Sequence, residues 1–135
     1  MVEGPPRILV VDDDRQVRDL LTGILADEGL SVTAVADGTA AMALLDTREF
    51  SLVIMDVRLG MGQDGREVIE RARLTQPELK SLYISGGTAG LAYNPDLDGF
   101  ISKPFRKREV IGCVWELHYR EPRRRQTEAD ITDFT

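Results

Sequence analysis

Acidic residues follow two of the apolar runs in this chain. Asp12 and Asp13 come directly after Ile8–Val11, and Asp56 comes directly after Leu52–Met55. Short, uniformly apolar runs are typical of strands in a parallel sheet that is covered on both faces. Because the carboxyl ends of such strands meet at one edge of the sheet, where open α/β sheets bind their ligands, we expect the three carboxylates to converge.

Three converging carboxylates would repel one another, and a bound divalent cation would remove that repulsion. A few protein oxygens completed by water suit Mg²⁺, or Mn²⁺ in its place. We expect Asp13, Asp56 and the backbone carbonyl of Arg58 to bind the ion directly and Asp12 to act through water. Asp14 is interpreted as a helix cap or a surface residue. Taken alone, the run of three aspartates is better explained by a helix N-terminus, where the dipole favours negative charge.

Two further polar residues follow later strands and indicate phosphoryl chemistry. Lys103 comes after Phe100–Ile101 and before Pro104, and its ammonium could neutralise a phosphoryl oxygen on Asp56. The Ser85 hydroxyl could donate a hydrogen bond to the same group. A cis peptide bond before Pro104 is possible at such a position. A solvated lysine and a turn serine are the ordinary alternatives, so the prediction depends on the combination of residues.

Strand and helix patterns alternate along the chain. Strands are expected at residues 8–11, 31–35, 52–55, 82–84 and 100–101. Helices are expected at residues 15–28, 40–47, 65–74 and 106–119, with a weak helical signal at 88–93. We expect Asp14 and Thr39 to cap the first two helices and Gly29 to end the first. This alternation predicts a parallel sheet with helices on both faces and right-handed crossovers.

The apolar positions of each helix predict which side chains reach the core. The candidates are Val17, Leu20, Leu21, Ile24 and Leu25, then Ala41, Leu44 and Leu45, then Val68, Ile69 and Ala72, and finally Val110, Ile111, Val114, Trp115 and Leu117. Cys113 is interpreted as a core residue and His118, the only histidine, as a partly exposed one.

Length and composition indicate one soluble domain with a real core. The chain has 135 residues, of which 42% are hydrophobic and 30% charged. Its net charge of -6 argues against nonspecific binding to nucleic acid, and one cysteine excludes an intrachain disulfide and a cysteine-rich metal site. No apolar run suits a membrane span and no signal-peptide pattern is present, so a cytoplasmic location is expected.

The expected organisation is a flexible leader at 1–6, one domain at 7–119 and a charged, disordered tail at 120–135. The arginines at the start of this tail could contact nucleic acid or an acidic partner, but a solvated tail is the simpler interpretation. The chain is too short to carry a sizeable output domain after the first.

Four motifs taken together resemble the receiver domain of two-component response regulators, of the stand-alone single-domain type. They are Val10–Asp13, Val53–Asp56, Ile84-Ser85 and Ile101–Phe105, and the resemblance covers about residues 7–119. It implies a flavodoxin-like doubly wound sheet of five parallel strands, in the order 2-1-3-4-5, with helices on both faces.

The resemblance also implies a role for individual residues. Asp56 corresponds to the phosphoacceptor, Asp12 and Asp13 to the acidic pair that binds Mg²⁺, Ser85 to the switch hydroxyl and Lys103 to the lysine that contacts the phosphoryl group. Phe100 stands where such domains carry a rotating aromatic residue. A plain core phenylalanine explains Phe100 equally well.

The chain departs from the pattern of the family next to Asp56. The following loop is rich in glycine, lacks the usual proline near Gly60 and is one residue longer before Asp64-Gly65, which leaves its path open. The resemblance places Arg58 and Gly87 at positions that affect how fast receivers lose the phosphoryl group. It does not say whether these two residues speed or slow that loss.

The expected function is that of a phosphoacceptor signalling protein rather than a classical enzyme. A sensor histidine kinase or a histidine phosphotransfer protein would donate the phosphoryl group, and phosphotransfer and later hydrolysis would be self-catalysed. Output would pass to a downstream protein target, with no direct DNA or membrane binding, from a monomer or weak dimer.

Three alternatives stay open at this point. The chain could be a phosphorylation-independent interaction module or a receiver fragment of a hybrid histidine kinase. An Mg²⁺-dependent phosphohydrolase is disfavoured, because such enzymes need a second aspartate where Arg58 stands.

Overall fold

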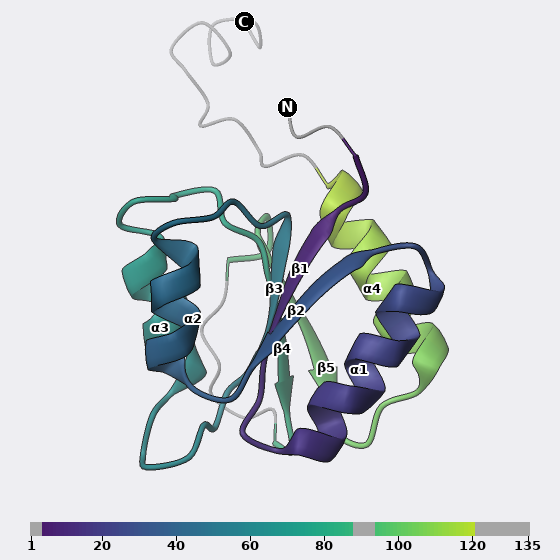
Figure 1. The fold of residues 1–135 in the computed structure, drawn as a ribbon, viewed down its shortest axis with the longest axis horizontal. Helices are drawn as coiled ribbons and strands as arrows, with labels where there is room; N and C mark the ends of the chain where they lie inside the picture. Colours follow the sequence, from purple (N-terminus) through teal and green to yellow (C-terminus); the bar gives the residue numbers. More distant parts are fainter. Residues whose placement is uncertain (1–3, 88–93, 121–135) are drawn as a thin grey trace, which may run out of the picture.

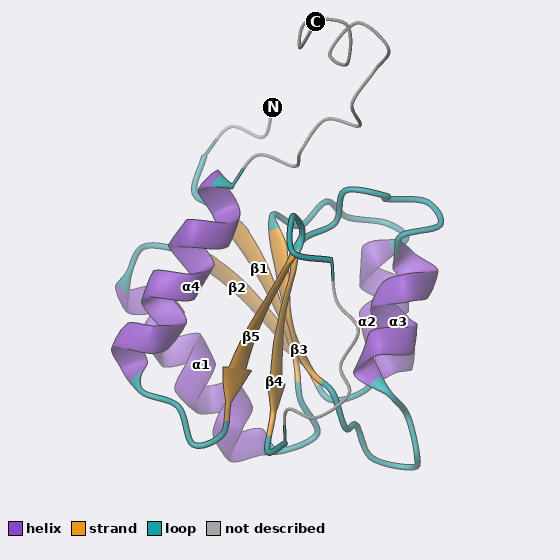
Figure 2. Cartoon of the chain, turned by 180° about the vertical axis from the view of Figure 1, so that it is seen from behind, coloured by secondary structure: helices purple, strands orange, loops and turns teal. Residues whose placement is uncertain are grey.

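The fold is a three-layer sandwich of helices around one parallel sheet (Figures 1 and 2). The computed structural model describes residues 4–87 and 94–120. The strands are β1 (Arg7–Val11), β2 (Ser31–Val35), β3 (Leu52–Asp56), β4 (Ser81–Ser85) and β5 (Asp98–Ser102). The helices are α1 (Arg15–Asp27), α2 (Gly38–Leu45), α3 (Gly65–Ala72) and α4 (Lys107–Tyr119). The weak helix expected at 88–93 lies outside the described residues.

The strand order is β2-β1-β3-β4-β5, and every pairing is parallel. Figure 1 shows α1 and α4 on one face of the sheet and α2 and α3 on the other. The alternation of strands and helices predicted the parallel sheet with helices on both faces, and the resemblance to receiver domains implied this strand order. The inner strands are buried over Ile8–Val11 of β1, Leu52–Asp56 of β3 and Ser81–Ser85 of β4, because successive side chains enter opposite, covered faces, whereas the edge strands β2 and β5 are partly exposed.

Two hydrophobic cores lie on either side of the sheet. The α1/α4 core contains Ile8, Val10, Leu21, Ile24, Leu25, Leu30, Leu52, Ile54, Leu82, Ile84, Ile101, Val110, Val114 and Leu117. The α2/α3 core contains Leu9, Val11, Ala41, Leu45, Val53, Met55, Val57, Leu59, Val68, Ile69, Ala72, Leu79 and Tyr83. Together they fix β1 and β3, two neighbouring inner strands whose carboxyl ends lead to the acidic residues.

The ends of α1 confirm the predicted cap and stop. The Asp14 side chain accepts a hydrogen bond from the Gln16 N–H at 2.9 Å. Gly29 takes a φ of +80°, and its N–H donates to the Ala26 carbonyl at 3.0 Å. A left-handed residue just past the helix is the usual way to satisfy the last carbonyls.

The predicted cap of α2 is wrong. Asp37, not Thr39, is the N-cap, and its side chain accepts a hydrogen bond from the Ala40 N–H at 2.8 Å. Asp37 has an extended backbone that lets its carboxylate reach back to the first turn, whereas Thr39 already lies within that turn.

Several predicted core positions are only partly covered. Leu20 is 53% exposed, because the sheet covers a narrower stripe of α1 than the sequence spacing implies. Val17, Leu44, Ile111, Cys113 and Trp115 are half-buried at the edges of the two cores.

Over the ranges 4–87 and 94–120, no helix has the length and apolarity needed to cross a bilayer.

Candidate functional site

The acidic residues converge where β1 and β3 end. Val11 lies opposite Met55 in the parallel pairing of these strands, which brings Asp12 and Asp56 to the same edge of the sheet. One carboxylate oxygen from each of Asp12, Asp13 and Asp56 lies within 4.8 Å of the others. Asp12 is 1% and Asp56 6% exposed, so two of the three charges are almost removed from water.

Hydrogen bonds fix both the backbone and the side chain of Asp12. Its N–H donates to the Val35 carbonyl at 3.2 Å, and its carbonyl accepts from Arg18 Nη1 at 2.9 Å. Its Oδ1 accepts from the Asp14 N–H at 2.9 Å. Burial raises the pKa of the Asp12 carboxyl, and the neighbouring charge of Asp56 raises it further.

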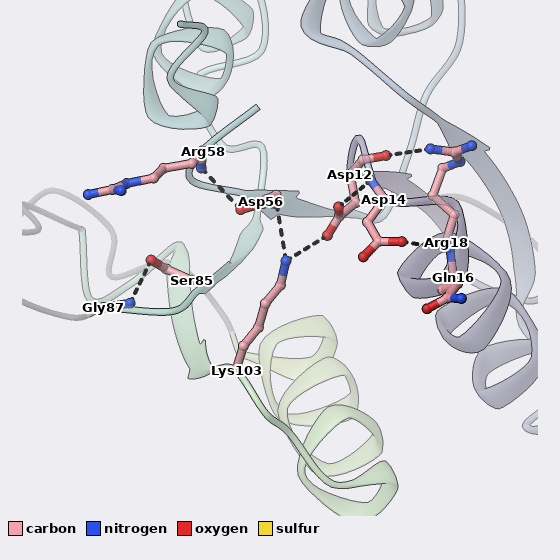
Figure 3. Close-up of polar contacts among 9 residues, drawn as sticks. All are labelled: Asp12, Asp14, Gln16, Arg18, Asp56, Arg58, Ser85, Gly87 and Lys103. Atoms are coloured by element: carbon pink, nitrogen blue, oxygen red, sulfur yellow. Dashed lines mark hydrogen bonds and ion pairs between the residues drawn. The ribbon is translucent and has the colours of Figure 1, made fainter. Parts of the chain in front are cut away.

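Lys103 lies between the two buried carboxylates (Figure 3). It follows β5, and its N–H donates to the Ser85 carbonyl at 2.8 Å. Its Nζ lies 3.1 Å from Asp12 Oδ2 and 3.1 Å from Asp56 Oδ2. Burial disfavours the charged ammonium, but the contacts with both carboxylates outweigh it, so the pKa of Lys103 is raised. The Lys103–Pro104 peptide bond is cis.

A hollow opens beside Asp56. It has a volume of about 370 Å³ and is lined by Asp56, Arg58, Ser85, Gly86, Gly87 and Lys103. The Arg58 N–H donates to Asp56 Oδ1 at 3.0 Å. Ser85 Oγ accepts from the Gly87 N–H at 3.1 Å, which leaves its hydroxyl hydrogen able to donate. The hollow therefore presents a nucleophilic carboxylate, a cation and a hydroxyl donor to the same space.

Phe100 does not join these residues. It lies on β5 opposite Tyr83 of β4, is half-buried and packs against the α2/α3 core. The other predicted site residues, Asp12, Asp13, Asp56, Arg58, Ser85 and Lys103, lie together.

The glycine-rich loop after β3 folds into a short hairpin, which we call the β3–α3 hairpin (residues 58–64). Arg58 and Asp64 form an antiparallel bridge, and the Leu59 N–H donates to the Gln63 carbonyl at 3.0 Å. Met61 and Gly62 have φ angles of +62° and +76°. Positive φ at both central residues suits a tight hairpin turn. The sequence left this path open, because a methionine gives no signal for a left-handed backbone.

Two glycines allow this hairpin and α3 to approach the acidic site closely. A Cβ on Gly60 would lie 3.3 Å from Asp13 Oδ2, and one on Gly65 would lie 2.1 Å from the Asp56 carbonyl oxygen. The Gly65 N–H donates to the Val57 carbonyl at 2.8 Å. Sequence reasoning missed the role of Gly65. The Asp64-Gly65 pair before an apolar helix was the available signal.

The donor atoms fit a hard divalent cation. Carboxylate oxygens are the protein ligands that Mg²⁺ and Mn²⁺ prefer, and the close approach of three of them favours a bound positive charge. The exposed side of Asp13 leaves room for the water ligands that Mg²⁺ usually keeps.

The sequence matches a known family over most of its length. The model of the response regulator receiver domain family matches residues 8–114. The chain is 36% identical to the response regulator receiver protein CpdR of Brucella abortus over 116 residues, which are 82% of this chain and 95% of that protein. It is 34% identical to the nitrogen assimilation regulatory protein NtrX of Azorhizobium caulinodans over 77% of this chain, which spans only 24% of NtrX.

Solved structures show the same fold. A CheY-like response regulator receiver domain protein from Methanospirillum hungatei superposes with a TM-score of 0.79 at 28% identity, over 85% of this chain and 94% of that one. The response regulator TrrA from Thermotoga maritima, crystallised with Mg²⁺-BeF, gives a TM-score of 0.72 at 29% identity, over 83% of this chain and 98% of that one. The strand order, the convergence of acidic residues and these matches lead to one conclusion: the chain belongs to the response regulator receiver domain family.

Proposed function

We propose that this chain accepts a phosphoryl group on Asp56 from a phosphohistidine of a sensor kinase or histidine phosphotransfer protein. The observation that carries the proposal is the position of Lys103, whose Nζ lies 3.1 Å from both Asp12 and Asp56 at the edge of the hollow. A positively charged side chain at this position can contact a phosphoryl oxygen and neutralise its negative charge during the transfer. The family to which the chain belongs supports the same chemistry.

The residues of the chain account for the transfer step. A carboxylate oxygen of Asp56 attacks the phosphorus, and an O–P bond forms while the P–N bond to the imidazole breaks. The electron pair of the broken bond stays on the imidazole nitrogen. Lys103 neutralises a phosphoryl oxygen, and Ser85 donates its hydroxyl hydrogen to another.

We propose that Asp13, Asp56 and the Arg58 carbonyl hold Mg²⁺, with Asp12 acting through water. Bound Mg²⁺ would supply neutralisation of the negative charge that accumulates around phosphorus. Asp12 contributes by keeping Lys103 beside Asp56 through their shared contact.

We further propose that the phosphorylated state is read by protein contact rather than by DNA binding. Residues 7–119 would form the complete receiver, and Ser85 and Phe100 would carry the signal from the site to the surface. CpdR, which the chain matches over 95% of its length, supports a receiver that works as a single domain. Because Phe100 lies outside the hollow, its part would be to repack when Ser85 moves.

The experiment that tests the proposal is intact mass spectrometry after incubation with acetyl phosphate. The parent chain should gain one phosphoryl group with Mg²⁺ and none after chelation with EDTA, and Asp56→Asn should gain none. A phosphohistidine-bearing phosphotransfer protein serves as the second donor. A folded, Mg²⁺-saturated parent that gains no phosphoryl group from either donor would refute the proposal.

A further inference from the structure

The side chain of Gln63 connects the β3–α3 hairpin to α2. Its Oε1 accepts a hydrogen bond from the Gly38 N–H at 3.0 Å, between residues 25 positions apart in the sequence. Gly38 is the first residue of α2, so this N–H is one of the helix donors without a partner inside the helix. The contact therefore satisfies a helix terminus with a side chain from the loop that follows the phosphoacceptor.

The fit around this contact is tight. A Cβ on Gly38 would lie 2.7 Å from Val68 Cγ2 and 3.2 Å from Gln63 Oε1. A larger residue at position 38 would therefore displace the Val68 side chain of α3 and crowd the Gln63 amide at the start of α2. Figure 1 shows α2 and α3 side by side on this face of the sheet.

The other side of the hairpin rests on the acidic site. The Arg58 N–H donates to Asp56 Oδ1 at 3.0 Å, and a Cβ on Gly60 would lie 3.3 Å from Asp13 Oδ2. Across the hairpin, the Leu59 N–H donates to the Gln63 carbonyl at 3.0 Å. A shift of Gln63 would thus be passed through one backbone hydrogen bond to the segment that contacts the carboxylates.

We propose that Gln63 is a positioning residue for the metal and phosphoryl site. By fastening the hairpin to the start of α2, it sets where Arg58 and Gly60 lie relative to Asp56 and Asp13. The inference rests on the proposed function, since it assigns to Gln63 a role in binding Mg²⁺ at that site. Replacing a residue that orients metal ligands without touching the ion commonly lowers metal affinity by one to two orders of magnitude.

The test compares two substitutions of Gln63. Gln63→Leu keeps the bulk of the side chain and removes the acceptor, and it should weaken Mg²⁺ binding about tenfold by calorimetric titration. It should also speed hydrogen exchange at the Leu59 amide, measured by NMR without any metal. Gln63→Glu keeps an acceptor for the Gly38 N–H, at a helix N-terminus where negative charge is favoured, and should restore slow exchange and at least the parent affinity.

Gln76→Leu is the matched control. Gln76 Nε2 donates to the carbonyl of Leu45, the last residue of α2, at 2.7 Å. A second glutamine therefore contacts α2 at the end opposite to Gly38. Its replacement should leave Mg²⁺ affinity and Leu59 exchange unchanged. Equal weakening by Gln63→Leu and Gln76→Leu would overturn the inference, because loosening of α2 as a whole would explain both.

The outcomes separate the inference from the proposed function. Gln63→Leu could bind Mg²⁺ as tightly as the parent chain and keep slow exchange at the Leu59 amide. That result would overturn the inference but leave the proposed function standing. A parent chain that binds no Mg²⁺ would overturn the proposed metal site and this inference with it.

Discussion

Gly65→Ala should damage both the fold and the proposed phosphoacceptor site. The added Cβ would lie 2.1 Å from the Asp56 carbonyl oxygen and 2.6 Å from Met55 Cγ. Real Cβ contacts essentially never fall below 3.0 Å, so α3 and β3 would have to separate by about 0.9 Å, the difference between 3.0 and 2.1 Å. The obstacle is strand backbone, which cannot rotate away as a long side chain can.

The expected loss of stability follows from three contributions. Overpacking a closely packed contact costs about 3 kcal/mol at the upper end of its usual range. Weakening the 2.8 Å hydrogen bond from the Gly65 N–H to the Val57 carbonyl costs about 1 kcal/mol more. The lower chain entropy of alanine in the unfolded state returns about 1 kcal/mol. The free energy of unfolding should therefore fall by about 3 kcal/mol.

Equilibrium urea unfolding measures this loss, and Gly112→Ala provides the control. Gly112 lies within α4 with nothing within 4 Å of its added Cβ, so alanine should stabilise the chain by about 0.5 to 1 kcal/mol. The rate of phosphoryl uptake in folded Gly65→Ala should drop about a hundredfold, because a displacement near 1 Å misplaces Asp56. Parent-like stability and uptake in Gly65→Ala would refute this account of the close approach.

Three further substitutions test separate contacts. Lys103→Met should slow phosphoryl uptake from acetyl phosphate about a hundredfold by mass spectrometry, yet keep or tighten Mg²⁺ binding in calorimetry because a competing cation is gone; lost Mg²⁺ binding would contradict this. Hydrogen bonding from the Arg66 side chain lowers the pKa of Asp64, so its stabilisation is present above the unfolded pKa of about 3.9 and disappears as pH falls through the lower folded pKa. In Asp64→Asn, the free energy of unfolding measured with urea should therefore fall less steeply as the pH is lowered. A slope between pH 6 and 3 equal to that of the parent chain would count against the contact. Arg73→Met leaves Asp98, 3% exposed, without its 2.5 Å ion-pair partner and should lower the free energy of unfolding in urea by about 3 kcal/mol, largely recovered by adding Asp98→Asn. No recovery would show that the lost hydrogen bonds from Arg73 to the Leu79 carbonyl, or its lost packing, dominate.

The convergence of Asp12, Asp56 and Lys103 was predictable from the sequence because each residue ends a strand or directly follows one. In a doubly wound sheet the ends of neighbouring strands meet whatever the helices do. Apolar runs and helix spacing therefore predicted the parallel sheet and the gathering of these side chains, whereas the strand order was implied by the resemblance to receiver domains.

The contacts that depend on the exact path of the backbone were not predictable. Gln63 meets Gly38 only because the hairpin turns at Met61, and no local pattern joins residues 25 positions apart. The Asp37 cap was missed because two neighbouring residues could each cap α2 and only the backbone geometry decides between them. Leu20 was misplaced because periodicity gives the direction of an apolar stripe but not the width that the sheet covers.

The separation of the α1/α4 core from the α2/α3 core has a consequence for how this chain can change over generations. Side chains that alternate along one strand, such as Leu9 and Val10 of β1, belong to different cores with the backbone of the sheet between them. Substitutions in the two cores share no packing neighbours, so their effects on unfolding free energy should add. Each helical face can therefore be repacked within its own half without altering the shared edge of the sheet where Asp12, Asp13 and Asp56 lie together.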